Sequence, residues 1–171
     1  MTAVLSRQDI QCLIHQQPPL VEGYLDLKAQ LQPNGIDLTL RDVALLQTGG
    51  KVTISNDHRV VPDIAPLVFD GLGFIDLIPG IYTITYNEIV NLPNNVMALA
   101  SPRSSLLRCG VSVGTAVWDA GYRGRSRSLL VVYNPQGFRV QKDARVVQLI
   151  FFRLSGETEG YRGDYQGENI T

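Results

Sequence analysis

The chain contains SPRSSLLRCG at residues 101–110 and DAGYRG at residues 119–124. The first stretch is a cationic turn rich in hydroxyl groups, and the second carries one carboxylate. Asp119 is the only acidic residue between Glu88 and Asp143, whereas the same region holds a group of arginines: Arg103, Arg108, Arg123, Arg125 and Arg127. A cationic turn close to a single carboxylate is the combination that hydrolysis of a polyphosphate needs.

Each part of this pattern has a physical role to offer. Arg103 has a planar guanidinium group suited to bidentate contacts with phosphate, and Ser104 and Ser105 add hydroxyl donors beside backbone N–H groups. A carboxylate such as Asp119, within a preorganised site, can orient a water molecule and accept its proton. The ring of Tyr122 can lie flat against a sugar, where crowding would disfavour an extra hydroxyl group and so select deoxyribose.

Structural explanations compete with these roles. Arg-Ser-Ser is common in loops, Asp-Ala-Gly-Tyr can form a turn between two strands, and surface arginines often make solvated ion pairs. The functional interpretation therefore depends on the joint occurrence of the two stretches and not on either one alone.

Length and composition limit the class of protein. A chain of 171 residues is normally one domain, and 44% hydrophobic residues with only 18% charged residues fit a globular protein. The net charge of -1 argues against a general nucleic-acid binder, which needs a broad basic surface. No apolar stretch approaches the roughly 18 residues of a membrane span, and the N-terminus lacks the pattern of a signal peptide. We therefore expect a cytoplasmic protein without a membrane or nucleic-acid partner.

Cysteine and histidine side chains are few. Cys12 and Cys109 cannot form a disulfide framework and have apolar neighbours, so we expect two buried thiols. His15 and His58 lack the neighbours that the zinc deaminases of nucleobases require, namely His-x-Glu together with Pro-Cys-x-x-Cys. The sequence therefore predicts no zinc site and no catalytic cysteine.

Short runs of β-branched and aromatic residues, bounded by Gly, Pro or Asn, predict a mainly β protein. These predicted strands cover residues 81–86, 96–100, 129–133 and 145–152. One short helix is expected near the N-terminus. There Ser6 precedes Asp9 in the manner of a helix cap, and residues 10, 13 and 14 supply apolar side chains at helical spacing.

The last sixteen residues, 156–171, contain four glycines, two tyrosines and few aliphatic side chains. Such a segment cannot build a hydrophobic core. It is predicted to be a mobile tail, either a lid over a bound molecule or a frayed terminus.

Several stretches of the chain resemble, in the right order, the motifs of the trimeric dUTPases and dCTP deaminases. The resemblance covers most of the chain, and four ordered motifs are a specific signal. The stretches are QPNGIDL (32–38) for the first motif, LIPGIY (77–82) and EIVNLP (88–93) for the lead-in to the second, PRSS (102–105) for the second, VWDAGYRG (117–124) for the third and VQKDARVVQLIF (140–151) for the fourth.

The resemblance implies a distorted jelly-roll β-barrel of the β-clip type, with one short N-terminal helix and a single domain over residues 1–171. It also implies a homotrimer whose active sites lie between subunits. Residues 161–168 resemble the C-terminal segment of the deaminase branch, which closes over bound nucleotide, so closure of residues 156–171 would exclude water and add contacts.

The resemblance also assigns roles to single residues. Asp119 would be the catalytic base. Asp37 either supports the phosphate and metal region or fixes the turn after Asn34 and Gly35. The metal would be Mg²⁺, held mainly through phosphate oxygens and water without a protein cage. The substrate-binding residues would be Arg103, Ser104, Ser105, Arg108, Tyr122, Gln148, Tyr161 and Gln166.

One position separates the two activities of the family. The overall sequence is nearer to the dCTP deaminases, which carry a glutamate in the strand after the Asp-x-Gly-aromatic-x-Gly turn. Here that strand holds Leu129 ten residues past Asp119, and no acidic residue occurs from Ala120 to Lys142. We therefore favour a dUTPase that attacks the α-phosphorus of dUTP with water to give dUMP and pyrophosphate. A dCTP deaminase, including a bifunctional one that forms dUMP, and a non-catalytic nucleotide-responsive trimer stay open as alternatives.

A few residues depart from the family's pattern. Ala116 stands where dUTPases usually have Gly, and Trp118 replaces a smaller aliphatic residue, so Trp118 is expected to be a core or interface anchor. Asp164 and Glu168 stand where the deaminase branch tends to carry Lys and Gln.

Overall fold

The computed structural model describes residues 4–170. Residues 1–3 and Thr171, at the two ends of the predicted domain 1–171, lie outside the described residues. The helical segments are α1 (Arg7–Ile14), α2 (Leu27–Gln30), the 3-10 segment η1 (Asn56–His58) and α3 (Ser104–Arg108). The strands are β1 (Val21–Glu22), β2 (Leu31–Gln32), β3 (Gly35–Leu46), β4 (Ile64–Pro66), β5 (Phe74–Leu77), β6 (Gly80–Tyr86), β7 (Ile89–Asn91), β8 (Val96–Pro102), β9 (Val111–Gly114), β10 (Arg123–Gly124), β11 (Arg127–Val132), β12 (Phe138–Gln141) and β13 (Arg145–Arg153).

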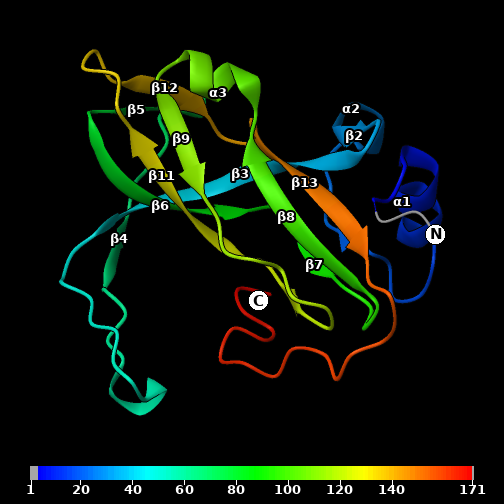
Figure 1. Cartoon of the computed structure of the whole chain (residues 1–171). Helices are drawn as coiled ribbons and strands as arrows, with labels where there is room; N and C mark the ends of the chain where they lie inside the picture. The colour runs from blue at the N-terminus through cyan, green and yellow to red at the C-terminus, as the bar shows by residue number, and fades with distance from the viewer. Residues whose placement is uncertain (1–3, 171) are drawn as a thin grey trace.

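The main sheet is antiparallel and nearly closes on itself (Figure 1). Its strand order is β8-β13-β3-β6-β11-β9, and β2 and β4 also pair with β3. The two edge strands, β8 and β9, are joined through α3, and a bridge between Ala98 and Trp118 links β8 to the loop that follows β9. This arrangement confirms the predicted β-barrel fold.

The four predicted strands correspond to β6, β8, β11 and β13. In β13, which pairs with β3 on one side and β8 on the other, every second side chain from Val147 onward points into the core, after a register shift at Val146. Val147, Leu149 and Phe151 are fully buried. This period of two is the signature of a strand with one face against a core, which explains why the sequence predicted it.

Helix α1 begins as the sequence predicts. The Ser6 hydroxyl accepts a hydrogen bond from the backbone N–H of Asp9, and the Asp9 carboxylate accepts one from the backbone N–H of Ser6 at 2.9 Å. This reciprocal capping satisfies N–H groups that a helix end leaves without partners. Ile10 and Ile14 face the core, so packing holds the helix in place.

The predicted short helix near the N-terminus is present as α1. The described residues also contain three helical segments that the sequence did not indicate, α2, η1 and α3, each of about one turn, which is too short to produce an apolar period. The prediction of two buried thiols is wrong. Cys12 and Cys109 are exposed, not buried. Cys12 lies on the outer side of α1, while Cys109 is the C-cap of α3.

Two smaller sheets complete the fold, β1-β7-β10 and β12-β5. In the first, Arg123 pairs with Asn91 and Gly124 with Val90, so the sheet fixes the end of the DAGYRG stretch. Among the described residues, no helix is long and apolar enough to cross a membrane.

A buried carboxylate ties several of these elements together. Glu88 accepts hydrogen bonds from the Thr39 backbone N–H at 2.8 Å, the Thr39 hydroxyl at 2.6 Å and the Gln30 amide at 2.7 Å. The Gln30 side-chain oxygen in turn accepts from two backbone N–H groups just before α2. Burial raises the pKa of Glu88, and the hydrogen bonds to Thr39 and Gln30 oppose that shift. Glu88 therefore joins β3, α2 and the start of β7 through one polar contact point.

We expect Glu88→Ala to lower the free energy of unfolding by about 3 kcal/mol, because buried donors on Thr39 and Gln30 lose their acceptor. Thermal unfolding would then begin roughly 6–12 °C earlier than in the unmodified protein. Glu157→Ala, which removes an exposed carboxylate, is the control and should leave the midpoint unchanged. Equal midpoints for the two variants would show that the Glu88 contacts contribute little.

Candidate active site

The cationic turn of the sequence forms the start of α3. Arg103 is the N-cap residue, and Ser104 and Ser105 make up the first turn with exposed hydroxyl groups. Leu106 is buried and anchors the helix. Arg108 lies exposed in the last turn. The turn therefore presents guanidinium and hydroxyl donors to solvent from an anchored backbone, an arrangement suited to binding phosphate.

Asp37 holds Arg103 in this position. Its carboxylate is 2% exposed and lies 3.1 Å from Nε of Arg103 and 3.3 Å from Nη1 of Arg145. Burial raises the pKa of Asp37, and the two guanidinium groups oppose that shift. Asp37 thus contacts both the phosphate turn, through Arg103, and the β2–β3 hairpin around Asn34, through the Gln32 amide, which donates to it at 3.3 Å. The sequence does not identify Arg145 as a partner of Asp37, because the two residues become neighbours only when β13 pairs with β3.

Gln148 lies in the same row of the sheet as Asp37. It pairs with Asp37 across β3 and with Ser101 across β8, and directly paired residues project from the same face. Gly35 opens β3 next to it, where a Cβ atom would lie 2.9 Å from the Gln148 side-chain nitrogen. Such a Cβ atom would lie closer still, at 2.5 Å, to the Leu149 carbonyl, so the glycine of the first motif lets β3 pass close to both Leu149 and the Gln148 side chain. We call Asp37, Arg103, Ser104, Ser105 and Gln148 the predicted phosphate half-site, or phosphate half-site for short.

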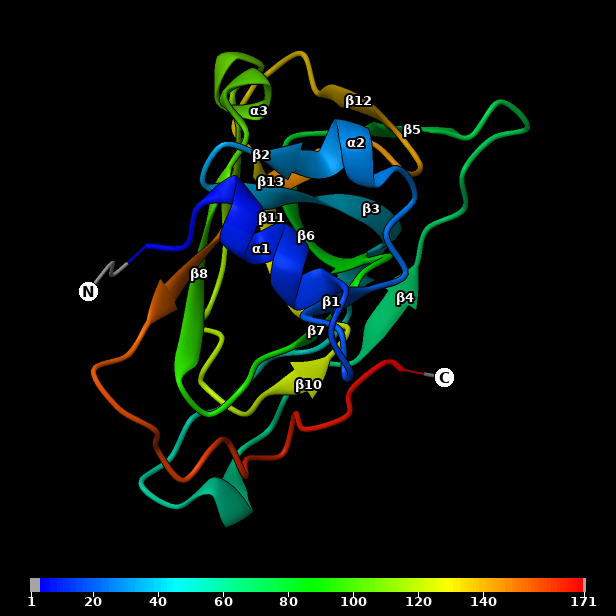
Figure 2. The same ribbon diagram turned by 90° about the vertical axis from the view of Figure 1, so that its right-hand side faces the viewer.

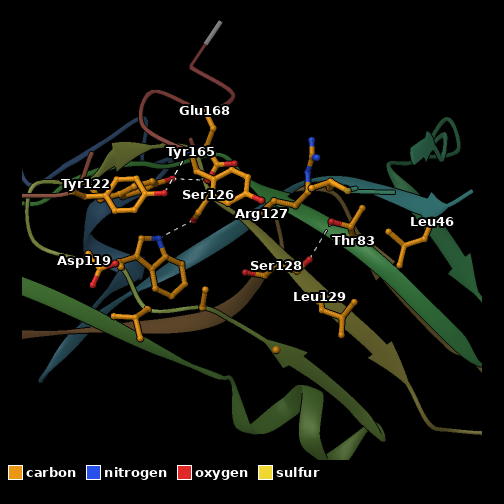
Figure 3. Close-up of a pocket in the computed structure, with 16 residues that line it drawn as sticks. Leu46, Thr83, Asp119, Tyr122, Ser126, Arg127, Ser128, Leu129, Tyr165 and Glu168 are labelled. Carbon is orange, nitrogen blue, oxygen red and sulfur yellow. Dashed lines mark hydrogen bonds between the residues drawn. The ribbon is translucent and has the colours of Figure 1, made fainter. Parts of the chain in front are cut away.

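Asp119 lies in a different place, in a pocket of about 550 Å³ (Figure 3). The loop after β9 supplies Trp118 and Asp119, while β11 supplies Ser128 and Leu129. Asp119 itself is exposed to the pocket.

Leu129 faces Gly114 in the pairing of β11 with β9, and both residues line the pocket. The strand position at which a deaminase glutamate is expected therefore does reach the pocket, and in this chain it is apolar. The spacing argument from the sequence is consistent with this geometry.

Tyr122 forms an inner wall of the pocket. It is 5% exposed, its ring meets that of Tyr161 edge to face at 5.8 Å, and its hydroxyl donates to the Glu168 carboxylate at 2.9 Å. Burial raises the pKa of the Tyr122 hydroxyl, so it stays a donor. A ring fixed on two sides is well suited to packing against a sugar.

The C-terminal segment, residues 156–170, lies along the DAGYRG stretch. The Gln166 side chain donates to the Gly121 carbonyl at 2.9 Å and accepts from the Arg123 N–H at 2.8 Å. The backbone of Gly167 donates to the Arg123 carbonyl, and Glu168 accepts from the Arg125 N–H. In the structure this predicted tail makes specific contacts, although it contains neither helix nor strand.

Two glycines make this contact possible. Gly121 has a φ of +82°, and a Cβ atom there would lie 2.6 Å from the Gly160 backbone. A Cβ atom on Gly124 would collide with the Tyr122 hydroxyl. Any larger residue at either position would push the C-terminal segment or the Tyr122 ring out of place.

The two groups of predicted site residues do not meet within one chain. Ala98, the bridge partner of Trp118, lies four strand residues before Pro102, which corresponds to about 13 Å along β8. Figures 1 and 2 show α3 at one end of the molecule and the C-terminal segment at the other. Asp119, Tyr122 and Tyr161, the predicted nucleoside half-site, therefore lie apart from the predicted phosphate half-site.

Residues 4–154 match the sequence pattern of the family described as dCTP deaminase-like. The chain belongs to the dCTP deaminase-like family. It is 52% identical to a probable deoxyuridine 5'-triphosphate nucleotidohydrolase of Methanosarcina mazei over 98% of both chains. It is 34% identical to the deoxyuridine 5'-triphosphate nucleotidohydrolase of Methanocaldococcus jannaschii, over 81% of this chain and 88% of the relative.

Among solved structures, a 2'-deoxycytidine 5'-triphosphate deaminase from Agrobacterium tumefaciens is similar, with a TM-score of 0.65 and 23% identity. The match covers 89% of this chain but only 48% of the deaminase chain. At this level of identity the likeness supports the dCTP deaminase-like fold and nothing finer.

Two side chains of the pocket differ from the family's pattern, and both take part in its polar contacts. Trp118 is 4% exposed, and its indole N–H donates to the Ser126 hydroxyl at 2.9 Å, so it combines a core position with a place in the pocket wall. Glu168 was not predicted as a site residue. Its departure from the deaminase pattern was the only signal, and its contact with Tyr122 depends on chain folding that no local pattern shows.

Glu168 makes the contact of the C-terminal segment dependent on pH. Burial raises its pKa, while the Tyr122 hydroxyl and Arg127 oppose the shift. The contact is therefore strongest below the ordinary glutamate pKa of about 4.3 and weakens as the pH rises through the raised value.

We expect hydrogen exchange at Gly167, whose N–H donates to Arg123, to show this loss of protection as the pH rises above the ordinary range of a glutamate. Glu168→Gln keeps an oxygen for the Tyr122 hydroxyl but has no charge to gain, so its protection should not change. The ratio of the two exchange rates at each pH removes the intrinsic pH dependence of exchange. A constant ratio would contradict a role for Glu168 ionisation.

Proposed function

We propose that this chain is a dUTP nucleotidohydrolase, which converts dUTP and water to dUMP and pyrophosphate. The observation that carries the proposal is a pocket with Asp119 at one side and apolar Leu129 at the strand position where a deaminase needs its glutamate. The names of relatives at up to 52% identity over nearly the full chain support the same activity.

In this proposal Asp119 orients a water molecule and takes its proton as the water oxygen attacks the α-phosphorus. A new P–O bond forms, the bond to the bridging oxygen breaks, and pyrophosphate leaves with that electron pair. Asp119 later releases the proton to solvent. Its position in the open part of the pocket suits contact with both water and nucleotide.

The deoxynucleoside would occupy the pocket. The fixed ring of Tyr122 would pack against the deoxyribose and leave no room for a 2'-hydroxyl group. Uracil would be read by backbone groups of residues 114–118. We further propose that Tyr161 and Gln166 act from the C-terminal segment, which works as a lid on the single domain.

The phosphates would bind the phosphate half-site, with Arg108 as a further cation. Because this half-site lies away from Asp119 in the same chain, we propose a homotrimer in which one subunit supplies Asp119 and its neighbour supplies Arg103, Ser104 and Ser105. Each active site would then lie between two subunits.

A divalent cation would bind at this site mainly to the phosphates of the substrate and not to protein side chains. Among residues 4–170, no group of three or more His, Cys, Asp and Glu side chains could hold a metal ion. Asp37 is already paired with Arg103 and Arg145, so it would support the metal region without binding the cation directly. We propose Mg²⁺ bound mainly by triphosphate oxygens and water, where it would neutralise charge on the phosphates. Because free deoxynucleoside triphosphates are intracellular metabolites, the proposal places the enzyme in the cytoplasm.

A product assay with Mg²⁺ tests this function, with dUTP and dCTP offered separately and nucleotides separated by chromatography. We expect dUMP and pyrophosphate from dUTP and no turnover of dCTP. Asp119→Asn should lower kcat by at least about 100-fold, because the base is lost. Asp76→Asn, at an exposed carboxylate on β5, is the control and should retain activity.

Other products would contradict the proposal in different ways. Conversion of dCTP to dUTP or dUMP would show a deaminase that uses a residue other than Leu129. Binding of both nucleotides without any product would favour a nucleotide-responsive trimer.

A further inference from the structure

The chain between β3 and β4, residues 47–63, forms an arm that extends from the barrel (Figure 1). It contains η1 and a bridge between Lys51 and Val60. Figures 1 and 2 both show the arm beside the C-terminal segment. Val61 of the arm lines the pocket that holds Asp119.

Arg59 joins the arm to the C-terminal segment by two contacts. Its Nη2 atom lies 2.6 Å from the Asp164 carboxylate, and its guanidinium carbon lies 5.3 Å from the ring centre of Tyr165. The Arg59 side chain is only 25% exposed although it belongs to a projecting arm. An ion pair and a cation–π contact from one guanidinium to two consecutive residues fix both their place and their orientation.

One of the two residues that Arg59 contacts, Tyr165, belongs to the wall of the pocket. Tyr165 lines it, together with Tyr161 and Glu168 of the same segment. The backbone N–H of Tyr165 also donates to the Tyr161 hydroxyl at 3.4 Å. In Figure 3, Tyr165 lies near Tyr122 and Glu168 at the same end of the pocket.

Arg59 acts on a part of the segment that the barrel does not hold. Gln166, Gly167 and Glu168 are hydrogen-bonded to the DAGYRG stretch, whereas Asp164 is 64% exposed and is paired with the arm. Without Arg59, residues 162–165 would keep only bonds within the segment, such as those from Gln166 N–H to Gly163 and from Glu168 N–H to Tyr165, and would become more mobile. Residues 166–169 would stay attached to the barrel.

We infer that Arg59 is a positioning residue: through Asp164 and Tyr165 it holds the C-terminal segment as the outer wall of the nucleotide pocket, and so raises affinity for the nucleotide. The part of this inference that concerns affinity rests on the proposed function. Arg59 does not touch the reacting atoms, so its loss should affect binding more than the chemical step.

The chain offers a matched control. Arg139 of β12 lies 3.3 Å from the Asp70 carboxylate and 4.9 Å from the ring centre of Phe74, so it combines an ion pair and a cation–π contact as Arg59 does. It lies outside the lining of the Asp119 pocket. Arg139→Ala therefore removes the same kinds of contact without touching the pocket wall.

Limited digestion with trypsin, followed by mass spectrometry, reads the position of the segment without any need for activity. Arg162 is exposed and stands next to the residues that Arg59 holds. We expect Arg59→Ala to speed cleavage after Arg162 about three- to tenfold, while Arg139→Ala leaves it unchanged. Cleavage after Lys51 reports on the arm itself and should be similar in all three proteins.

Steady-state kinetics with dUTP and Mg²⁺ supply the second readout. We expect Arg59→Ala to raise KM about three- to tenfold, with kcat changed less than about twofold. Arg59→Lys keeps the ion pair but loses the planar stack on Tyr165. Its KM should therefore lie between that of the unmodified protein and that of Arg59→Ala. Asp164→Asn should resemble Arg59→Lys.

The two readouts separate failure of the inference from failure of the proposed function. Unchanged cleavage after Arg162 in Arg59→Ala would overturn the inference whatever the activity. Faster cleavage with an unchanged KM would overturn the link to nucleotide affinity. Faster cleavage in a protein that never hydrolyses dUTP would support the contact made by Arg59 and contradict the proposed function instead.

Discussion

The extended backbone of β8, fixed by its pairing with β13, is the constraint on which the arrangement of the site depends. This strand pairs with β13 from Val96 to Pro102 and is bridged to Trp118 near its start. Asp119 therefore lies beside one end of β8, and Arg103 follows the other end. A rigid strand cannot bring them together, so a single chain presents two half-sites. In the proposed homotrimer, a neighbouring subunit would bring the two half-sites together, and the symmetry of the trimer would form three such sites.

Small residues allow the second half of the site to form. Gly121 and Gly124 let the C-terminal segment reach the backbone of the DAGYRG stretch, and Glu168 then meets the buried hydroxyl of Tyr122. The pocket wall is thus made by contacts between residues far apart in the sequence. Tyr122 gains its fixed orientation from the segment, while the segment gains its place from the glycines. Changes that displace the C-terminal segment should therefore also lower the proposed dUTP hydrolysis, because Tyr122 would lose its fixed orientation.

Local patterns account for the parts of the fold that were predicted correctly. The period of two in β13 and the Ser6 cap of α1 are visible in neighbouring residues, and the apolar Leu129 followed from simple spacing. One-turn helices such as α3 leave no such pattern. Cys109 was wrongly expected to be buried, because the sequence does not show which side of α3 faces solvent. Arg145 and Glu168 were missed because their partners come from distant strands, and only the three-dimensional pairing reveals them.

The central claim is that each active site uses Asp119 of one subunit and Arg103 of another. It is tested most directly by mixing two inactive variants, Asp119→Asn and Arg103→Gln, by joint refolding and measuring dUTP hydrolysis. Equal amounts should restore about a quarter of the activity of the unmodified protein treated in the same way, because random assembly gives one site in four both intact residues. A mixture as inactive as its two parents, beside an active refolded control, would contradict the claim and place both residues in the site of one chain.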